Sequence, residues 1–360
     1  MVFFDVRKDW VIFAPFSVPA ARRGGAELSA YIGLLRQRAG AENRKPPAVQ
    51  DAGADTAPDA AALILLNPGD GGSYRNGFSW RLGEGRLEIY GDSERGLWNG
   101  IFDFLGALGL RWPDPDREEL PSPAAGVYPL RESRARQVSA PSAAGVSRLI
   151  VDEKTKPADR EALIRWAARN RIDALIRPFR DRRLKGRKLQ KRAAEAADYY
   201  ALVREAGGRE LSLLVPRRLF FFHRDLFRME SGRRVRDYNF CPTNPETIGI
   251  LKKKAAKLFD ALLCVFPGIP VFHLWPGRGH ENAWCACPAC RAFGAADQYR
   301  IAVNAAADAL AALAPAAKIS LYETPGEAAV EDGRNNIPLR ANVFRLDRLP
   351  DEDPPLPRNR

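Results

Sequence analysis

Ser147-Arg148-Leu149-Ile150-Val151-Asp152 is a short apolar run, and the helical segment 158–170 separates it from a second run, Ile172-Asp173-Ala174-Leu175-Ile176. Short apolar runs bounded by polar residues are typical of buried strands. A strand, a helix and another strand joined by short loops are typical of a parallel βαβ unit. The stretch therefore predicts an α/β fold with a parallel sheet.

The same alternation continues toward the end of the chain. Further strands are expected at 211–215, 270–275, 319–322 and 341–346, and helices at 188–206, 246–265 and 297–313. This order predicts a (β/α) TIM-like barrel over residues 135–360. Only about six strands can be counted, whereas a closed barrel has eight. Either the barrel is incomplete or the pattern hides further strands.

Residues 1–125 have a different pattern, which predicts a small α+β domain. Strands are expected at 10–14 and 62–66, a hairpin at 78–90 with its turn at Gly83-Glu84-Gly85, and helices at 19–40 and 94–108. One sheet with two helices on a face accommodates this order. The proline- and acid-rich stretch 112–129 predicts the exit from this domain.

The bulk composition is that of a soluble globular protein, with 46% hydrophobic and 28% charged residues. No apolar run is long enough to span a membrane, and the N-terminus lacks the pattern of a signal peptide. We therefore expect a cytoplasmic protein that binds no membrane. Five cysteines, an odd number with three crowded together, do not indicate a disulfide framework.

The formal net charge is +12. Basic residues are most concentrated in the run Arg180-Asp181-Arg182-Arg183-Leu184-Lys185-Gly186-Arg187-Lys188-Leu189-Gln190-Lys191-Arg192. Such a run fits either a polyanion site or a solvated loop with a first helical turn. No helix-turn-helix, zinc-finger or aromatic RNA-binding signature accompanies it, so the solvated loop is favoured and no nucleic-acid partner is expected.

Cys285, Cys287 and Cys290 lie within six residues, just beyond the strand expected at 270–275. Three thiolates suit a tetrahedral Zn²⁺, and Cys241 or His280 would supply the fourth ligand. The alternative is that they are small buried side chains that shape a tight loop. Four protein ligands leave no open position on the metal, so a metal here would be structural. We expect that catalysis requires no cofactor.

Two other reactive side chains are assigned to the core. His273 alternates within an expected strand, and Cys264 lies on an apolar helix.

Three passages resemble known families. The first resembles the small domain that precedes the barrel in α-glucuronidases and β-N-acetylhexosaminidases, and it reads Gly91-Asp92-Ser93-Glu94-Arg95-Gly96-Leu97-Trp98-Asn99-Gly100-Ile101-Phe102-Asp103-Phe104-Leu105. Two further passages resemble the barrel of the bacterial domain-of-unknown-function 4838 family. They are Phe240-Cys241-Pro242-Thr243-Asn244-Pro245-Glu246 and Trp284-Cys285-Ala286-Cys287-Pro288-Ala289-Cys290, and the second is followed by Tyr299 and Asn304. The resemblance extends over most of the chain and implies a glycoside-hydrolase-like fold.

The chain departs from that family at two places. Members often carry Gly-Gly-His after the third strand, where this chain has Val215-Pro216-Arg217-Arg218, and an Asn-Asp pair after the fourth, where it has Pro276-Gly277-Arg278-Gly279-His280-Glu281. These departures favour a non-catalytic protein on the same fold.

Glycoside hydrolysis needs two carboxyl groups at the bond, or one carboxyl with help from the substrate. Glu281 is the expected acid, because nearby Trp275 and Trp284 provide apolar surroundings that raise the pKa of a carboxyl group. Glu323 follows the next strand and is the expected base. The alternative is that both are carboxylates of surface loops.

Aromatic rings stack on sugars, and guanidinium groups pair with the carboxylates of uronic acids, although strand-end aromatics also pack into cores. The expected substrate-binding residues are Trp275, Arg278, His280, Trp284, Tyr322 and Arg217.

We therefore expect a glycoside-hydrolase-like protein that acts on oligosaccharides containing a uronic acid or an amino sugar. A non-catalytic carbohydrate-binding or scaffold protein is the alternative, and polyanion binding through the basic run 180–192 is a weaker one.

Overall fold

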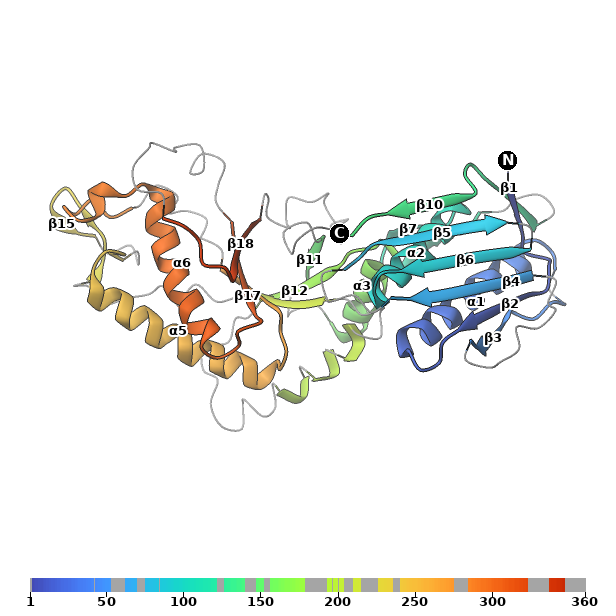
Figure 1. Ribbon diagram of the computed structural model, residues 1–360, viewed down its shortest axis with the longest axis horizontal. Helices are drawn as coiled ribbons and strands as arrows, with labels where there is room; N and C mark the ends of the chain where they lie inside the picture. The colour runs from blue at the N-terminus through green and yellow to red at the C-terminus, as the bar shows by residue number, and fades with distance from the viewer. Residues whose placement is uncertain are drawn as a thin grey trace.

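A computed structural model describes most of the chain: residues 2–41, 43–52, 62–69, 75–83, 85–121, 126–139, 147–151, 156–178, 193–195, 197–199, 201–203, 210–214, 226–235, 240–274, 284–322 and 337–346. Figure 1 shows two units side by side along the long axis. An α+β unit comes first, and a parallel sheet with helices follows. The predicted fold class, an α+β domain followed by an incomplete (β/α) barrel, is confirmed.

The first unit is built on a six-stranded sheet with two helices packed against one face (Figure 1). Its strand order is β10 (Arg134–Gln137), β5 (Phe78–Gly83), β6 (Arg86–Gly91), β4 (Ala62–Pro68), β2 (Trp10–Ala14) and β3 (Ala48–Asp51), and the helices are α1 (Pro19–Arg38) and α2 (Glu94–Ala107). Alternate residues of β5 are buried, as in a strand with one face on a core. Helix α2 begins where the Ser93 hydroxyl accepts the Gly96 N–H at 3.1 Å, an N-cap bond.

Four short strands complete this unit, and the sequence pattern did not predict them. Strands β1 (Val2–Asp5) and β9 (Val127–Leu130) pair antiparallel, and β7 (Arg111–Asp114) pairs with β8 (Arg117–Glu119). The stretch expected to be an exit segment thus carries three strands. The domain boundaries at 125 and 135 stay a prediction, although β9 pairs with β1 and β10 with β5, both strands of the first unit.

The second unit contains a sheet of six strands, all parallel to their neighbours (Figure 1). The order is β11 (Arg148–Ile150), β12 (Ala174–Pro178), β13 (Glu210–Leu214), β16 (Val271–Leu274), β17 (Lys318–Tyr322) and β18 (Val343–Leu346), with helices α3 (Pro157–Arg169), α5 (Pro245–Val265) and α6 (Ala295–Ala311). Sequence order equals spatial order along this sheet. Each of these strands corresponds to one of the predicted apolar runs.

The two faces of this sheet differ in chemistry. On β16, the ring of Phe272 packs against Phe259 of α5 with centroids 5.0 Å apart. The next residue, His273, points to the opposite face, where its Nε2 lies 2.8 Å from the hydroxyl of Ser212 and its Nδ1 bonds Ser320. The structural assignment of His273 is therefore confirmed.

The core assignment of Cys264 is wrong. This cysteine is exposed on α5, even though neighbouring residues of that helix are buried. An apolar residue type within an amphipathic helix does not by itself fix the face on which it lies.

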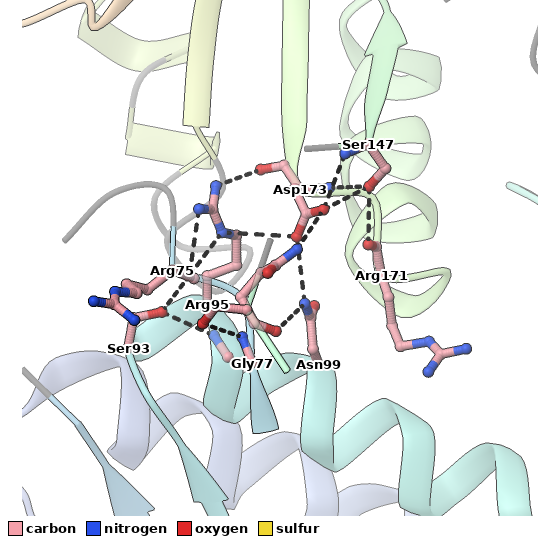
Figure 2. Close-up of polar contacts among 11 residues, drawn as sticks. Arg75, Gly77, Ser93, Arg95, Asn99, Ser147, Arg171 and Asp173 are labelled. Carbon is pink, nitrogen blue, oxygen red and sulfur yellow. Dashed lines mark hydrogen bonds and ion pairs between the residues drawn. The ribbon is translucent and has the colours of Figure 1, made fainter. Parts of the chain in front are cut away.

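Asp173 joins the two units at the amino ends of β11 and β12 (Figure 2). Its Oδ2 accepts hydrogen bonds from the Asn76 side chain at 3.0 Å and from the Ser147 hydroxyl at 2.7 Å. Its Oδ1 accepts from Asn99 at 3.4 Å and lies 3.7 Å from Nε of Arg95. The carboxyl ends of the parallel strands, where α/β proteins build their sites, lie at the other end of the sheet.

Candidate functional site

The predicted catalytic site belongs to the carboxyl ends of β13, β16 and β17. The segments that follow these strands carry six predicted site residues, and all six lie outside the described residues: Arg217, Trp275, Arg278, His280, Glu281 and Glu323. The basic run 180–192 lies outside them as well. Strands β16 and β17 are adjacent, with Leu274 opposite Leu321. The segments that carry Glu281 and Glu323 therefore leave the sheet from neighbouring positions.

Two predicted substrate-binding aromatics are described. Tyr322 is the last residue of β17 and exposes only 6% of its surface. Trp284 is half-buried and packs against the main core, and its carbonyl accepts a hydrogen bond from Arg228 at 3.4 Å. Both lie where the sequence placed them, beyond or at the end of a strand. Their contact with a sugar stays a prediction.

Helix α6 orders the connections around this end of the sheet. The hydroxyl of Tyr299 donates to the carbonyl of Leu274 at 2.5 Å, at the end of β16. Five residues further along, the Asn304 amide donates to the carbonyl of Pro338 at 2.8 Å and accepts the Arg340 N–H at 3.1 Å. Tyr299 therefore holds the end of β16 against α6, and Asn304 holds the segment before β18.

Sequence reasoning missed two polar residues of the same helix. The Asp297 carboxylate accepts the N–H of Ile337 at 2.9 Å. The Gln298 side chain accepts the N–H of Cys285 at 2.9 Å and donates to the Cys285 carbonyl at 3.1 Å. Both residues are polar and buried in an alanine-rich helix. Polar side chains among alanines were therefore the sequence signal that could have identified them.

The four cysteines form a compact, buried cluster. Cys241 Sγ lies 3.7 Å from the sulfur of Cys287 and 3.6 Å from that of Cys290. All four sulfurs, including that of Cys285, lie within 4.8 Å of one another. The structure thus brings Cys241 to the predicted triplet, so four sulfurs are in place without the alternative ligand His280.

Short, irregular segments position these sulfurs. Cys241 precedes α5, whose first turn is capped by Asn244. The hairpin of β14 (Met229–Glu230) and β15 (Arg233–Arg234) lies on one side of the cluster, and the 3₁₀ helix Cys290–Ala292 closes the other. The carbonyl of Met229 accepts the N–H of Ala286 at 2.7 Å, which ties the hairpin to the cysteine loop.

Hydrogen bonds to the sulfurs set their ionisation. The Cys290 thiol and the Met229 N–H, which lies 3.3 Å from the Cys285 sulfur, lower the pKa of Cys285 from its usual value. The same Cys285 neighbour raises the pKa of Cys290. The first thiolate is thus stabilised by its neighbours, whereas each further thiolate would meet its negative charge.

No family model and no curated protein sequence matches the chain. The resemblance to the domain-of-unknown-function 4838 family therefore stays a prediction. Among the described residues, we find no helix with the length and apolarity needed to cross a membrane.

Solved structures do match. A GH20 exo-β-N-acetylglucosaminidase from Vibrio harveyi, in complex with N-acetylglucosamine, is 13% identical with a TM-score of 0.51, over 95% of this chain and 54% of that one. A β-N-acetylhexosaminidase from Bacteroides fragilis is 13% identical with a TM-score of 0.51, over 96% of this chain and 67% of that one. A chitobiase from Flavobacterium johnsoniae is 15% identical with a TM-score of 0.53, over 96% and 52%.

These likenesses define the class of fold. Over nearly the whole chain, both units included, the fold is similar to that of these three structures. It spans 52–67% of the length of these three structures. At such identities the likeness concerns the fold, and activity has to be argued from the site.

Proposed function

We propose that this protein binds oligosaccharides containing an N-acetylated amino sugar at the carboxyl end of its parallel sheet, and hydrolyses a glycosidic bond there. The observation that supports this proposal is the arrangement of both units, which is similar over nearly the whole chain to that of β-N-acetylhexosaminidases. Ligands of parallel α/β sheets bind at the carboxyl ends of the strands. Among the described residues, the first unit contacts the amino ends of β11 and β12 through Asp173, at the opposite end from the proposed site.

The proposed chemistry uses Glu281 as the general acid that protonates the leaving oxygen. Glu323 acts as the base, or holds the substrate where the N-acetyl group of the sugar takes the place of the second carboxylate. The adjacent strands β16 and β17 support this pair, because the two segments start side by side. Half-buried Trp284 supplies ring surface for stacking on the sugar, whereas Tyr322, only 6% exposed, would contribute through the edge that remains accessible.

A uronic acid in the same oligosaccharide is the second substrate class. Arg217 and Arg278 support it, because a guanidinium group binds a carboxylate through two parallel hydrogen bonds. These residues follow β13 and β16, which are also adjacent in the sheet.

A non-catalytic carbohydrate-binding protein is the second candidate function. It is favoured by the six strands of the described sheet, where a complete barrel of this type has eight. The residues that replace Gly-Gly-His and Asn-Asp in this chain point in the same direction. The two candidate functions can be separated by measuring both turnover and sugar binding on the wild type and the same variants.

The experiment combines turnover and binding. Aryl β-N-acetylglucosaminides, β-N-acetylgalactosaminides and β-glucuronides are offered to the wild type, Glu281→Gln, Glu323→Gln and the control Glu161→Gln, whose residue is exposed on α3. Loss of general acid catalysis should lower kcat about 100-fold or more in Glu281→Gln and leave the control unchanged. Full activity of Glu281→Gln would make the site assignment wrong.

Calorimetry with chitobiose and with a uronic-acid-containing disaccharide completes the test. Binding without turnover in the wild type would replace hydrolysis by the non-catalytic function. Absence of both binding and turnover would contradict the proposal as a whole.

A further inference from the structure

We propose that Cys241, Cys285, Cys287 and Cys290 bind one structural Zn²⁺, which clamps the segment after β13 to the segment after β16. The proposal rests on the geometry and surroundings of the four sulfurs and does not depend on carbohydrate binding. No part of the proposed sugar chemistry uses this cluster.

The spacing of the sulfurs fits a tetrahedral metal. With Zn–S bonds of about 2.3 Å, the sulfurs at the corners of a tetrahedron are about 3.8 Å apart. The separations from Cys241 are 3.7 Å to Cys287 and 3.6 Å to Cys290, and no pair exceeds 4.8 Å. A disulfide needs an S–S distance of about 2.05 Å, and all four cysteines are free.

The groups around the sulfurs are hydrogen-bond donors, which thiolates require. The N–H of Met229 points to the Cys285 sulfur at 3.3 Å, and the N–H of Cys290 points to the Cys287 sulfur at 3.4 Å. The Thr243 hydroxyl lies 3.0 Å from the Cys290 sulfur. Donors of this kind orient metal-bound thiolates and spread their charge.

Apolar packing contributes little to holding the segments of the cluster together, and hydrogen bonds such as that of Ala286 to Met229 are the other ties among the described residues. The four cysteines form a buried group separate from the main core, and Met229 is the partly buried apolar residue packed against it. The surrounding structure consists of two-residue strands and one 3₁₀ turn. Such segments bury too little apolar surface to stay ordered by packing alone, and a metal is the usual substitute in small modules.

Positive charge is available to balance the site. Four thiolates around Zn²⁺ carry a net charge of about −2. Arg228 and Arg291 lie on the same segments, and their guanidinium groups bond the carbonyls of Trp284 at 3.4 Å and Ala286 at 3.2 Å. Arg228 also pairs with Glu230 at 3.0 Å, so Arg291 is the less compensated of the two charges. Arginine therefore brackets the loop that carries Cys285.

Zn²⁺ is favoured over iron, which the same sulfur set can hold. A given site of this kind generally binds Zn²⁺ more tightly than Fe²⁺, and four thiolates leave Zn²⁺ no open position for chemistry. The ion would fix residue 284, at which the segment carrying Glu281 ends, and so give one side of the candidate site a rigid support.

The test measures metal on the full chain, with no sugar present. Elemental analysis of wild type purified without chelator should find about one equivalent of zinc per chain. Cys290→Ser should lose it, whereas the matched control Cys264→Ser, at the exposed fifth cysteine, should retain it. Less than about half an equivalent in the wild type, also after addition of zinc, would overturn the proposal.

Two measurements on the wild type test the site without relying on a variant that could misfold. Replacement of the ion by Co²⁺ should give the intense visible bands of tetrahedral cobalt thiolate, and removal by a strong chelator should lower the Tm until zinc is restored. Absence of the cobalt bands, or a chromophore from bound iron in the purified protein, would contradict a Zn²⁺ site.

Discussion

The guanidinium group of Arg148 lies over the ring of Phe344, 5.6 Å from its centroid. Arg148 opens β11 and Phe344 lies within β18, and these are the two edge strands of the six-stranded parallel sheet. A single side chain therefore spans the space between the edges. The sheet curls far enough for its concave face to be enclosed, although six strands are fewer than a complete barrel of this type uses.

The first prediction concerns this contact. Phe344→Leu keeps an apolar side chain but removes the ring face, so it should lower the free energy of unfolding by about 1 kcal/mol, the value of a cation–π pair at a partly exposed site. Urea unfolding measures the change. Phe3→Leu is the control, because Phe3 is 53% exposed and its replacement should cost less than about 0.5 kcal/mol. Equal effects of the two substitutions would show that the ring of Phe344 has no special role.

The second prediction concerns pH. Burial, and then the positive charge of Arg148, hold the pKa of His273 well below its usual 6.5. The unfolded chain therefore binds an extra proton below pH 6.5, so stability should fall as the pH drops through this value, by at most about 1.4 kcal/mol per pH unit. Above about pH 7.5 the residue is neutral in both states and contributes no pH dependence.

Urea unfolding at pH 7.5, 6.5 and 5.5 tests this with wild type and His273→Gln. The variant should be less stable at pH 7.5, because it loses bonds to Ser212 and Ser320, yet its stability should decline less toward pH 5.5. Asp5 and Asp308 do not interfere, since their pKa values are lowered from 3.8 and they stay ionised in this window. Parallel declines in the two proteins would contradict the prediction.

The parallel sheet could be predicted from the sequence because its strands are buried on both faces. A strand such as β12 or β16 then forms a continuous apolar run, with a helix between it and the next. Strands β8 and β10 escaped the same reasoning. Their sequences, Arg117-Glu118-Glu119 and Arg134-Ala135-Arg136-Gln137, are polar and largely exposed, so pairing with a neighbour and not burial defines them.

Only part of the cysteine cluster could be predicted from the sequence. Cys285, Cys287 and Cys290 are close in sequence, and local spacing is enough to group them. Cys241 was only one of two choices for a fourth member, because its distance from the others is set by tertiary packing. The bond from Asn76 to Asp173 spans 97 residues and left no local pattern at all.

The third prediction uses two glycines. A Cβ at Gly91 would lie 1.9 Å from the backbone nitrogen of Leu97, so the end of β6 can approach the first turn of α2 only without a side chain. Gly91→Ala should therefore destabilise the protein by about 3 kcal/mol. Gly249 lies exposed in α5, and a Cβ there would meet nothing within 4 Å. Gly249→Ala should instead stabilise by about 0.5–1 kcal/mol, as expected for a helix interior.

Urea unfolding of both glycine variants provides the comparison. Opposite signs are expected from the same chemical change. A destabilisation of less than about 1 kcal/mol in Gly91→Ala would mean that strand and helix can separate at little cost.

The fourth prediction concerns the junction between the units. Asp173→Asn removes the negative charge beside Arg95, and both side chains are almost fully buried, with 4% and 3% exposed. The buried arginine would keep its bonds to the carbonyls of Arg75 and Asp173 but lose the carboxylate that balances its charge. The new amide would direct hydrogens toward the Asn76 and Ser147 donors. A loss of about 3–5 kcal/mol in the free energy of unfolding is expected, as for other broken buried pairs.

Glu161→Gln serves as the matched control, since it makes the same type of change in an exposed pair with Arg165 and should cost less than about 0.5 kcal/mol. Limited proteolysis adds a second readout, because loosening at Asp173 should speed cleavage between the units in Asp173→Asn but not in the control. If Asp173→Asn were as stable and as resistant as the wild type, the junction would have to be held by other contacts, foremost the bond from the Trp166 indole to the Trp112 carbonyl at 2.8 Å. Removal of that bond in Trp166→Phe would then produce the loss that Asp173→Asn did not.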